Sequence, residues 1–160
     1  MKKVIISLAT VLLFANANSK INNSPVSLEL HSYQKSIIVD KKGKKVVKWV
    51  KPTKVVPGSI IKYETIIHND TNETLSDATI TSKIDKNLIF IPNSIKSKLK
   101  YDITFSTDGK NFAPAKELKI GVKNGKKYMA KPKDYRAIKF KVFNIPPRSN
   151  STISYQAKVK

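Results

Sequence analysis

The chain of 160 residues contains no cysteine. We therefore expect no disulfide, no thiol chemistry, no thiolate metal site and no lipid attached through an N-terminal cysteine. Stability has to come from packing alone. A domain of this length buries roughly two-thirds of its unfolded surface, which is enough for a hydrophobic core, so one domain is expected.

Arginine is scarce. Only Arg136 and Arg148 are arginine among 31 basic residues, and the 11 acidic residues leave a net charge of +20. Base and phosphate recognition favours arginine, and no basic helix or zinc motif is present, so a nucleic-acid partner is not expected. The lysine surplus indicates an anionic binding partner, either an acidic glycan or the phosphate groups of lipids. The competing interpretation is that lysine only keeps the surface soluble and blunts sheet edges.

Long apolar runs are also missing, except for one at the N-terminus. Two lysines are followed by the uncharged run Val4–Phe14, and Ala15 and Ala17 supply the small residues of a signal-peptidase site. The run is shorter than the ~18 residues that span a bilayer. The sequence predicts a signal peptide at residues 1–17 and a periplasmic or secreted protein without a membrane span. A buried N-terminal strand or helix is the alternative.

The rest of the chain has the two-residue alternation of half-buried strands, with turn residues at short intervals. The clearest strand is Ile60–Asn69, with Ile61 and Ile67 on one face and Lys62 and His68 on the other. The pattern predicts an all-β, immunoglobulin-like antiparallel sandwich of about seven to nine strands over residues 26–160, after a loose segment at residues 18–25. One helical turn is expected within residues 114–118.

Three hairpins are expected from turn residues. Residues 36–50 form the first, with Gly43 in its turn. Asp108-Gly109 and Asn124-Gly125 stand between alternating segments, which is typical of type I′ turns.

Several segments, in order, resemble the conserved-repeat domain of bacterial surface and envelope proteins, known as domain of unknown function eleven. They are Pro57–Asn69 with Pro-Gly at its start, Ala78–Ile80, Leu88–Ser94 and Ile145–Val159. The resemblance covers about residues 50–160 and implies an immunoglobulin-like sandwich in an exported protein. The segment at residues 95–134 is longer than the minimal module, and the family supplies no catalytic residues to carry over.

No catalytic or cofactor motif is recognised, and no enzyme activity is predicted. A zinc site would need His31, His68 and carboxylates brought together by the fold; two separate surface histidines are the simpler interpretation. The turn at residues 69–73 lacks the glycine and spacing of an EF-hand calcium loop. Asn72 lies in an acidic glycosylation sequon, although chance and turn propensity are the simpler explanation of this segment.

A lysine-rich segment surrounds the single tryptophan, and these residues are a candidate polyanion-binding site: Lys41, Lys42, Lys44, Lys45, Lys48 and Trp49. Trp49 could contact a glycan or a membrane interface, or it could point into the core while the lysines flank a sheet edge.

The first functional hypothesis is a non-enzymatic envelope protein with a structural or protein-binding role. The second is an electrostatic binder of anionic glycan or lipid. A hydrolase with an unrecognised site is the third.

Overall fold

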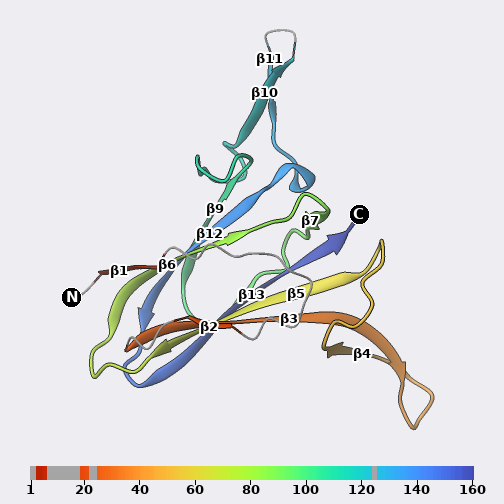
Figure 1. The fold of residues 1–160 in the computed structure, drawn as a ribbon, viewed down its shortest axis with the longest axis horizontal. Helices are drawn as coiled ribbons and strands as arrows, with labels where there is room; N and C mark the ends of the chain where they lie inside the picture. The colour runs from red at the N-terminus through yellow and green to blue at the C-terminus, as the bar shows by residue number, and fades with distance from the viewer. Residues whose placement is uncertain (1–2, 7–18, 22–24, 124–125) are drawn as a thin grey trace.

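The computed structural model describes residues 3–6, 19–21, 25–123 and 126–160. Two sheets pack face to face as a β-sandwich (Figure 1). The larger sheet has the order β2-β3-β5-β13-β7, with β4 paired to β3 and β8 paired to β13. Its strands are β2 (Ser19–Ile21), β3 (Val26–Val39), β4 (Lys45–Val50), β5 (Ile60–Asn69), β7 (Leu88–Phe90), β8 (Lys96–Ser97) and β13 (Ser149–Val159).

The smaller sheet has the order β1-β6-β12-β9. Its strands are β1 (Lys3–Ile6), β6 (Leu75–Lys83), β9 (Tyr101–Ser106) and β12 (Ala137–Ile145). A separate two-stranded ribbon, β10 (Lys119–Lys123) and β11 (Lys126–Met129), projects from the sandwich in Figure 1. The 3-10 helix η1 (Pro132–Asp134) follows the ribbon. The all-β, antiparallel prediction is thus confirmed, with the β1–β6 pair as a parallel exception.

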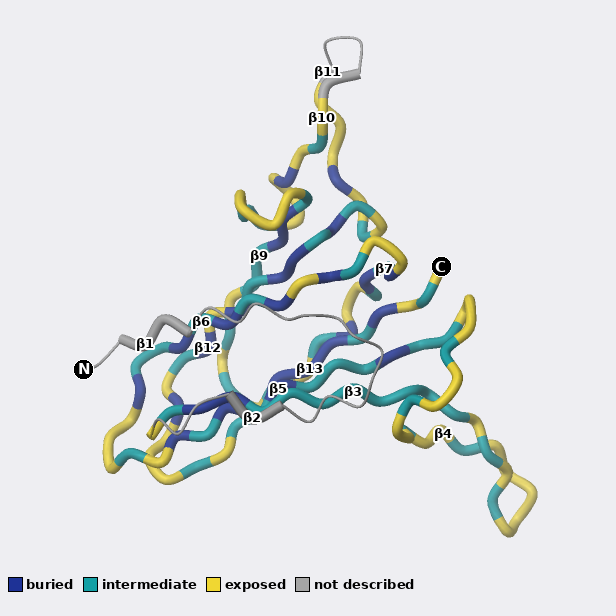
Figure 2. The backbone as a smooth tube through the Cα atoms, in the orientation of Figure 1, coloured by how far each residue is buried: buried dark blue, intermediate teal, exposed yellow. Residues whose placement is uncertain are grey.

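The core lies between the two sheets, where the buried parts of the strands face one another (Figure 2). Apolar side chains from both layers fill it, because alternate residues of each strand point inward. Aromatic rings pack closely at one place, with the Phe105 and Tyr135 rings 4.3 Å apart and Phe90 edge-on to Phe105 at 5.1 Å. Such ring pairs add stability beyond the area they bury.

The alternation in the sequence predicts β5 correctly at both ends and on both faces. Ile61, Thr65 and Ile67 are buried, and Lys62 and His68 are on the other side. The N-terminal pattern was harder to interpret, since the alternation at residues 26–30 and the run at residues 37–39 belong to one continuous strand, β3. The first half of β3 pairs with β5 and the second half with β4.

The hairpin of β3 and β4 is confirmed. Gly43 has a φ of 76°, which glycine adopts without strain. The Asp40 carboxylate accepts hydrogen bonds from the backbone N–H groups of Lys42 and Lys44, both at 2.8 Å. The turn is therefore held in one conformation, and it carries the lysines of this segment at the end of an arm that extends beyond the sandwich (Figure 1).

The prediction of a type I′ turn at Asp108-Gly109 is wrong. Only Gly109 has a positive φ there, and the chain returns through a single bridge between Phe105 and Ala113. Asp108 instead accepts hydrogen bonds from the backbone of Asn111 and Lys110 and from Ser106 Oγ, which hold the pKa of its carboxyl well below the usual value. The side chain closes a wider loop, so a positive φ at Asp108 is not required.

The Asn124-Gly125 pair lies outside the described residues, but the strands beside it pair as a hairpin with Lys123 opposite Lys126. The single helical turn expected at residues 114–118 is present. The backbone N–H groups of Glu117 and Leu118 both donate to the carbonyl of Pro114.

Part of the expected signal peptide is described as strand β1, which pairs in parallel with β6, so that Val4 lies opposite Ala78. Ala15 and Ala17 lie outside the described residues. No helix in the described part of the chain is long and apolar enough to cross a membrane.

Candidate functional site

The outer face of the larger sheet, turned away from the core, carries polar and aromatic side chains. Register places Lys62 of β5 between Tyr33 of β3 and Gln156 of β13. One row further along, Glu64 lies between His31 and Ser154. These rows form because neighbouring strands bring their outward side chains side by side. A polar sheet face of this kind is a surface for contact with water or with a ligand.

A hollow of about 360 Å³ lies in this face. Side chains from four strands and the residue after β8 line it. The charged and aromatic members are Trp49, Lys62, Glu64, Lys96 and Lys98. The remaining lining residues can donate or accept hydrogen bonds, and they are Ser97, Thr152, Ser154 and Gln156.

Lys62 lines the hollow and is held in place by three neighbouring side chains. Its Nζ lies 2.9 Å from Glu64 Oε2, 4.4 Å from the centre of the Tyr33 ring and 5.6 Å from the centre of the Trp49 ring. Ammonium groups are attracted to aromatic faces at such distances. The carboxylate and the two rings therefore fix the position of this lysine, and the carboxylate balances its charge.

Lys96 and Lys98 supply the net positive charge of the hollow. Both are exposed, and no carboxylate among the described residues lies within ion-pair distance of either ammonium group. Lys96 is opposite Ser154 in the β8–β13 pair, which brings this basic segment beside the rest of the site. The hollow thus combines an aromatic side, hydrogen-bonding groups and two cations without a partner carboxylate.

The structure divides the lysine-rich segment predicted from sequence. Trp49 is half-buried on the outer face, and it is absent from the core, so the interpretation that it points into the core is wrong. Lys48 points to the opposite face, because adjacent residues of a strand alternate. The other four are exposed around the hairpin turn, away from the hollow: Lys41, Lys42, Lys44 and Lys45.

The sequence alone did not identify three lysines of the hollow as site residues: Lys62, Lys96 and Lys98. Lys62 appeared only as the polar side of a strand, and the segment at residues 96–98 carried no motif. No local pattern could have joined them to Trp49, since sheet pairing alone brings these segments together.

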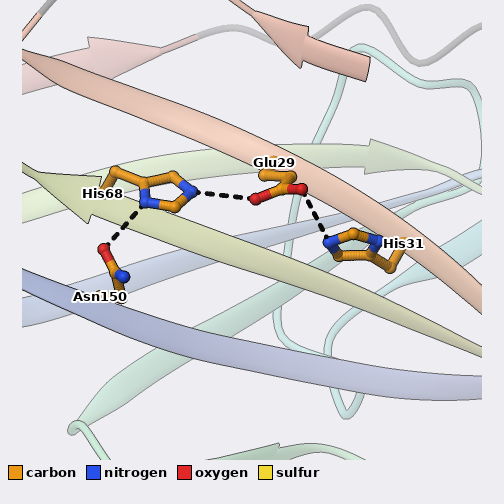
Figure 3. A network of polar contacts seen from close by, with 4 residues as sticks. All are labelled: Glu29, His31, His68 and Asn150. Atoms are coloured by element: carbon orange, nitrogen blue, oxygen red, sulfur yellow. Dashed lines mark hydrogen bonds and ion pairs between the residues drawn. The ribbon is translucent and has the colours of Figure 1, made fainter. Parts of the chain in front are cut away.

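Both histidines meet at one carboxylate on the same sheet face (Figure 3). Glu29 Oε1 lies 3.1 Å from His31 Nε2, and Glu29 Oε2 lies 3.2 Å from His68 Nε2. His68 Nδ1 also lies 2.8 Å from Asn150 Oδ1. The interpretation as two separate surface histidines is therefore wrong, since β3, β5 and β13 assemble a network around Glu29.

The chemistry of this network is limited by its own contacts. Both ring nitrogens of His68 face oxygen atoms of Glu29 and Asn150, so neither is left to activate a hydroxyl nucleophile. Over the described ranges, no group of three or more His, Asp or Glu side chains is placed to hold a metal ion.

The turn after β5 is closed by its own side chains. Asn69 is fully buried, and its Nδ2 donates to the carbonyls of Glu73 and Pro146 while its Oδ1 accepts from Thr71. This inward amide is not available as a calcium ligand. Asn72, the glycosylation candidate, is exposed at the turn, and its Oδ1 accepts a hydrogen bond from Arg148 Nε at 2.9 Å.

Comparisons of the chain with protein-family models, with curated proteins and with solved structures find no match.

Proposed function

We propose that this chain is an exported, non-enzymatic module of the cell envelope that binds an anionic envelope polymer. The observation that carries the proposal is the unpaired lysine surface. Among the lysines whose side chains are described, only Lys62 and Lys141 make ion pairs with carboxylates. A surface of this kind attracts polyanions and releases their counterions on binding.

Export is supported by the order of basic start, apolar run and small residues over residues 1–17. The resemblance to domain of unknown function eleven supports the envelope location and an immunoglobulin-like version of the sandwich. Its Asn at the end of the first strand corresponds to Asn69, whose amide joins two turns at one end of the sandwich. The extra length at residues 95–134 corresponds to the region containing the projecting ribbon of β10 and β11.

The non-enzymatic part of the proposal is supported by the outer sheet face. In the cluster of titratable groups around Glu29, both ring nitrogens of His68 are engaged by oxygen atoms. The hollow in this face contains Glu64, the carboxylate that pairs with Lys62. This arrangement suits binding better than proton transfer, which needs a group free to exchange its proton.

The test is retention of the mature chain, residues 18–160, on immobilised polygalacturonate and on neutral dextran. We expect retention on the acidic polymer only, with the logarithm of the binding constant falling linearly with the logarithm of salt concentration. Equal retention on dextran, or binding unaffected by salt, would contradict the proposal. Export is tested separately by sequencing the N-terminus of the secreted protein, which should begin at residue 18.

A protein partner is the second candidate, and one observation favours it. Ile37, Val39 and Val47 are exposed side chains on one face of the arm formed by β3 and β4. Exposed apolar rows of this kind mark contact surfaces. Crosslinking in cells, followed by identification of the captured protein, tests this candidate; replacement of the three residues by serine should abolish the crosslink.

A further inference from the structure

We infer that the hollow beside Trp49 is a binding site for an acidic saccharide, with a sugar ring against the indole and its acid group at Lys96 and Lys98. The inference rests on the proposed binding of an anionic polymer and names its site and ligand class. Trp49, Lys96 and Lys98 all line the hollow.

The size and lining of the hollow suit a sugar. Its volume of about 360 Å³ is in the range of small-ligand sites. Thr152, Ser154 and Gln156 can donate and accept hydrogen bonds, which is what several hydroxyl groups on one ring require. An acyl chain would need apolar walls, whereas Trp49 is the single apolar side chain of this lining.

Trp49 offers a flat apolar surface beside these polar groups. Its ring is half-buried and fixed on β4, and Lys62 lies 5.6 Å from its centre. The apolar C–H face of a pyranose ring can cover the exposed part of the indole while its hydroxyls reach the polar lining. Because Glu64 and Tyr33 already hold Lys62, little side-chain freedom is lost when a ligand binds.

Charge selects an acidic sugar over a neutral one. The Lys62 and Glu64 charges cancel at 2.9 Å, so the two cations without a partner carboxylate decide the sign of the site. Lys96 and Lys98 lie on the β13 side of the hollow, on a segment paired with Ser154. A carboxylate or sulfate placed there would pair with both ammonium groups.

The test uses the fluorescence of Trp49, the single tryptophan of the chain. The mature chain is titrated with a galacturonate tetramer and with the same tetramer after methyl esterification of its carboxylates. We expect the acidic tetramer to change the emission with saturation, and the ester to bind at least about tenfold more weakly.

Matched lysine variants separate the hollow from general electrostatics. Lys96→Ala with Lys98→Ala should weaken binding of the acidic tetramer at least about tenfold, whereas Lys41→Ala with Lys42→Ala removes the same charge from the hairpin turn and should have less than about a threefold effect. Equal effects of the two pairs would overturn the site while leaving polyanion binding intact. Loss of all retention on polygalacturonate by the unmodified chain would instead overturn the proposed function.

Glu64→Gln provides a change of opposite sign. It frees the charge of Lys62, so binding of the acidic tetramer should become tighter while binding of the ester stays unchanged. An unchanged affinity for the acidic tetramer would count against the site. Circular dichroism of each variant checks that the sandwich is folded.

Discussion

A single buried amide joins the two turns at one end of the sandwich. Asn69 Nδ2 donates to the carbonyl of Pro146 at 2.7 Å and to that of Glu73 at 3.0 Å, and its Oδ1 accepts from Thr71 Oγ1 at 2.7 Å. The turn after β5 and the turn between β12 and β13 therefore share one side chain. A fully buried amide that satisfies several groups is costly to remove, because the two turns lose the hydrogen bonds that join them.

We predict that Asn69→Ala lowers the free energy of unfolding by about 3 kcal/mol, because the buried carbonyl of Ile145 and the part-buried carbonyls of Glu73 and Pro146 lose their donor. Urea unfolding measures this loss. Asn69→Asp should be at least as harmful at neutral pH, since a carboxylate would face carbonyl oxygens. Asn72→Ala, at an exposed position of the same turn, is the control and should cost less than about 1 kcal/mol; equal losses at positions 69 and 72 would contradict the prediction.

Tyr155 carries a phenolic hydroxyl inside the core. This hydroxyl lies 2.9 Å from Ser82 Oγ, and the Tyr155 ring stacks on the Tyr63 ring at a centroid distance of 5.3 Å. Burial raises the pKa of Tyr155 to about 12, and it also raises the pKa of Tyr63. The folded state thus binds this phenolic proton more tightly than the unfolded state does.

The pKa of Tyr155 predicts a pH dependence of stability. Because its folded pKa of about 12 lies above the ordinary tyrosine value of 10.0, the contribution of this hydroxyl to stability is complete below pH 10 and is lost as pH rises towards 12. Tyr155→Phe should lose about 1 kcal/mol at neutral pH and show a shallower loss between pH 10 and 12 than the unmodified chain. Urea unfolding across this range measures both. Parallel curves for the two proteins would refute the assignment, and the comparison removes the shared titration of lysines.

At the scale of elements, pairing partners were harder to predict than strands. The alternation located β5, β6 and β13, yet β3 has different neighbours along its length. Beyond the end of β5, strand β3 continues as an arm paired with β4 alone, which leaves Ile37 65 % and Val39 63 % exposed. Apolar residues mark the strand in both halves, as alternation in the first and as a continuous run in the second, although only the first half covers the core.

Strand β1 provides a test at this scale. It pairs with the edge of β6, and the core residues among those whose burial is described run from Leu28 to Ala157. We predict that a chain lacking residues 1–17 unfolds cooperatively and loses no more than about 2 kcal/mol, since edge hydrogen bonds are replaced by bonds to water. Urea unfolding and circular dichroism measure the result. A non-cooperative or much less stable chain would show that residues 1–17 are a structural strand and not a removable leader.

For the whole molecule, charge is the dominant electrostatic property. Removal of residues 1–17 takes two lysines and leaves a net charge of about +18. Repulsion among these charges opposes the compact state, and salt screens it over about 10 Å at 0.1 M. The lysine surface therefore lowers stability in the absence of an anion.

We predict that the melting temperature of the mature chain rises by at least about 2 °C between 0.02 and 0.2 M sodium chloride, because screening relieves this repulsion. Differential scanning calorimetry measures the shift. Replacement of Lys41, Lys42, Lys44 and Lys45 by glutamine lowers the net charge and should reduce the gain. A melting temperature that falls with salt would contradict the prediction.

Alternation in the sequence was enough to predict strands such as β5 and their buried faces, because it is a local property that a strand carries along its own length. The sequence also determined the β3–β4 hairpin, since Gly43 and the Asp40 side chain act within a few residues. Only the tertiary structure decided which outward side chains meet. Trp49 lines one hollow together with Lys62 and Lys96, and both histidines share Glu29, because sheet register brings together residues far apart in the chain.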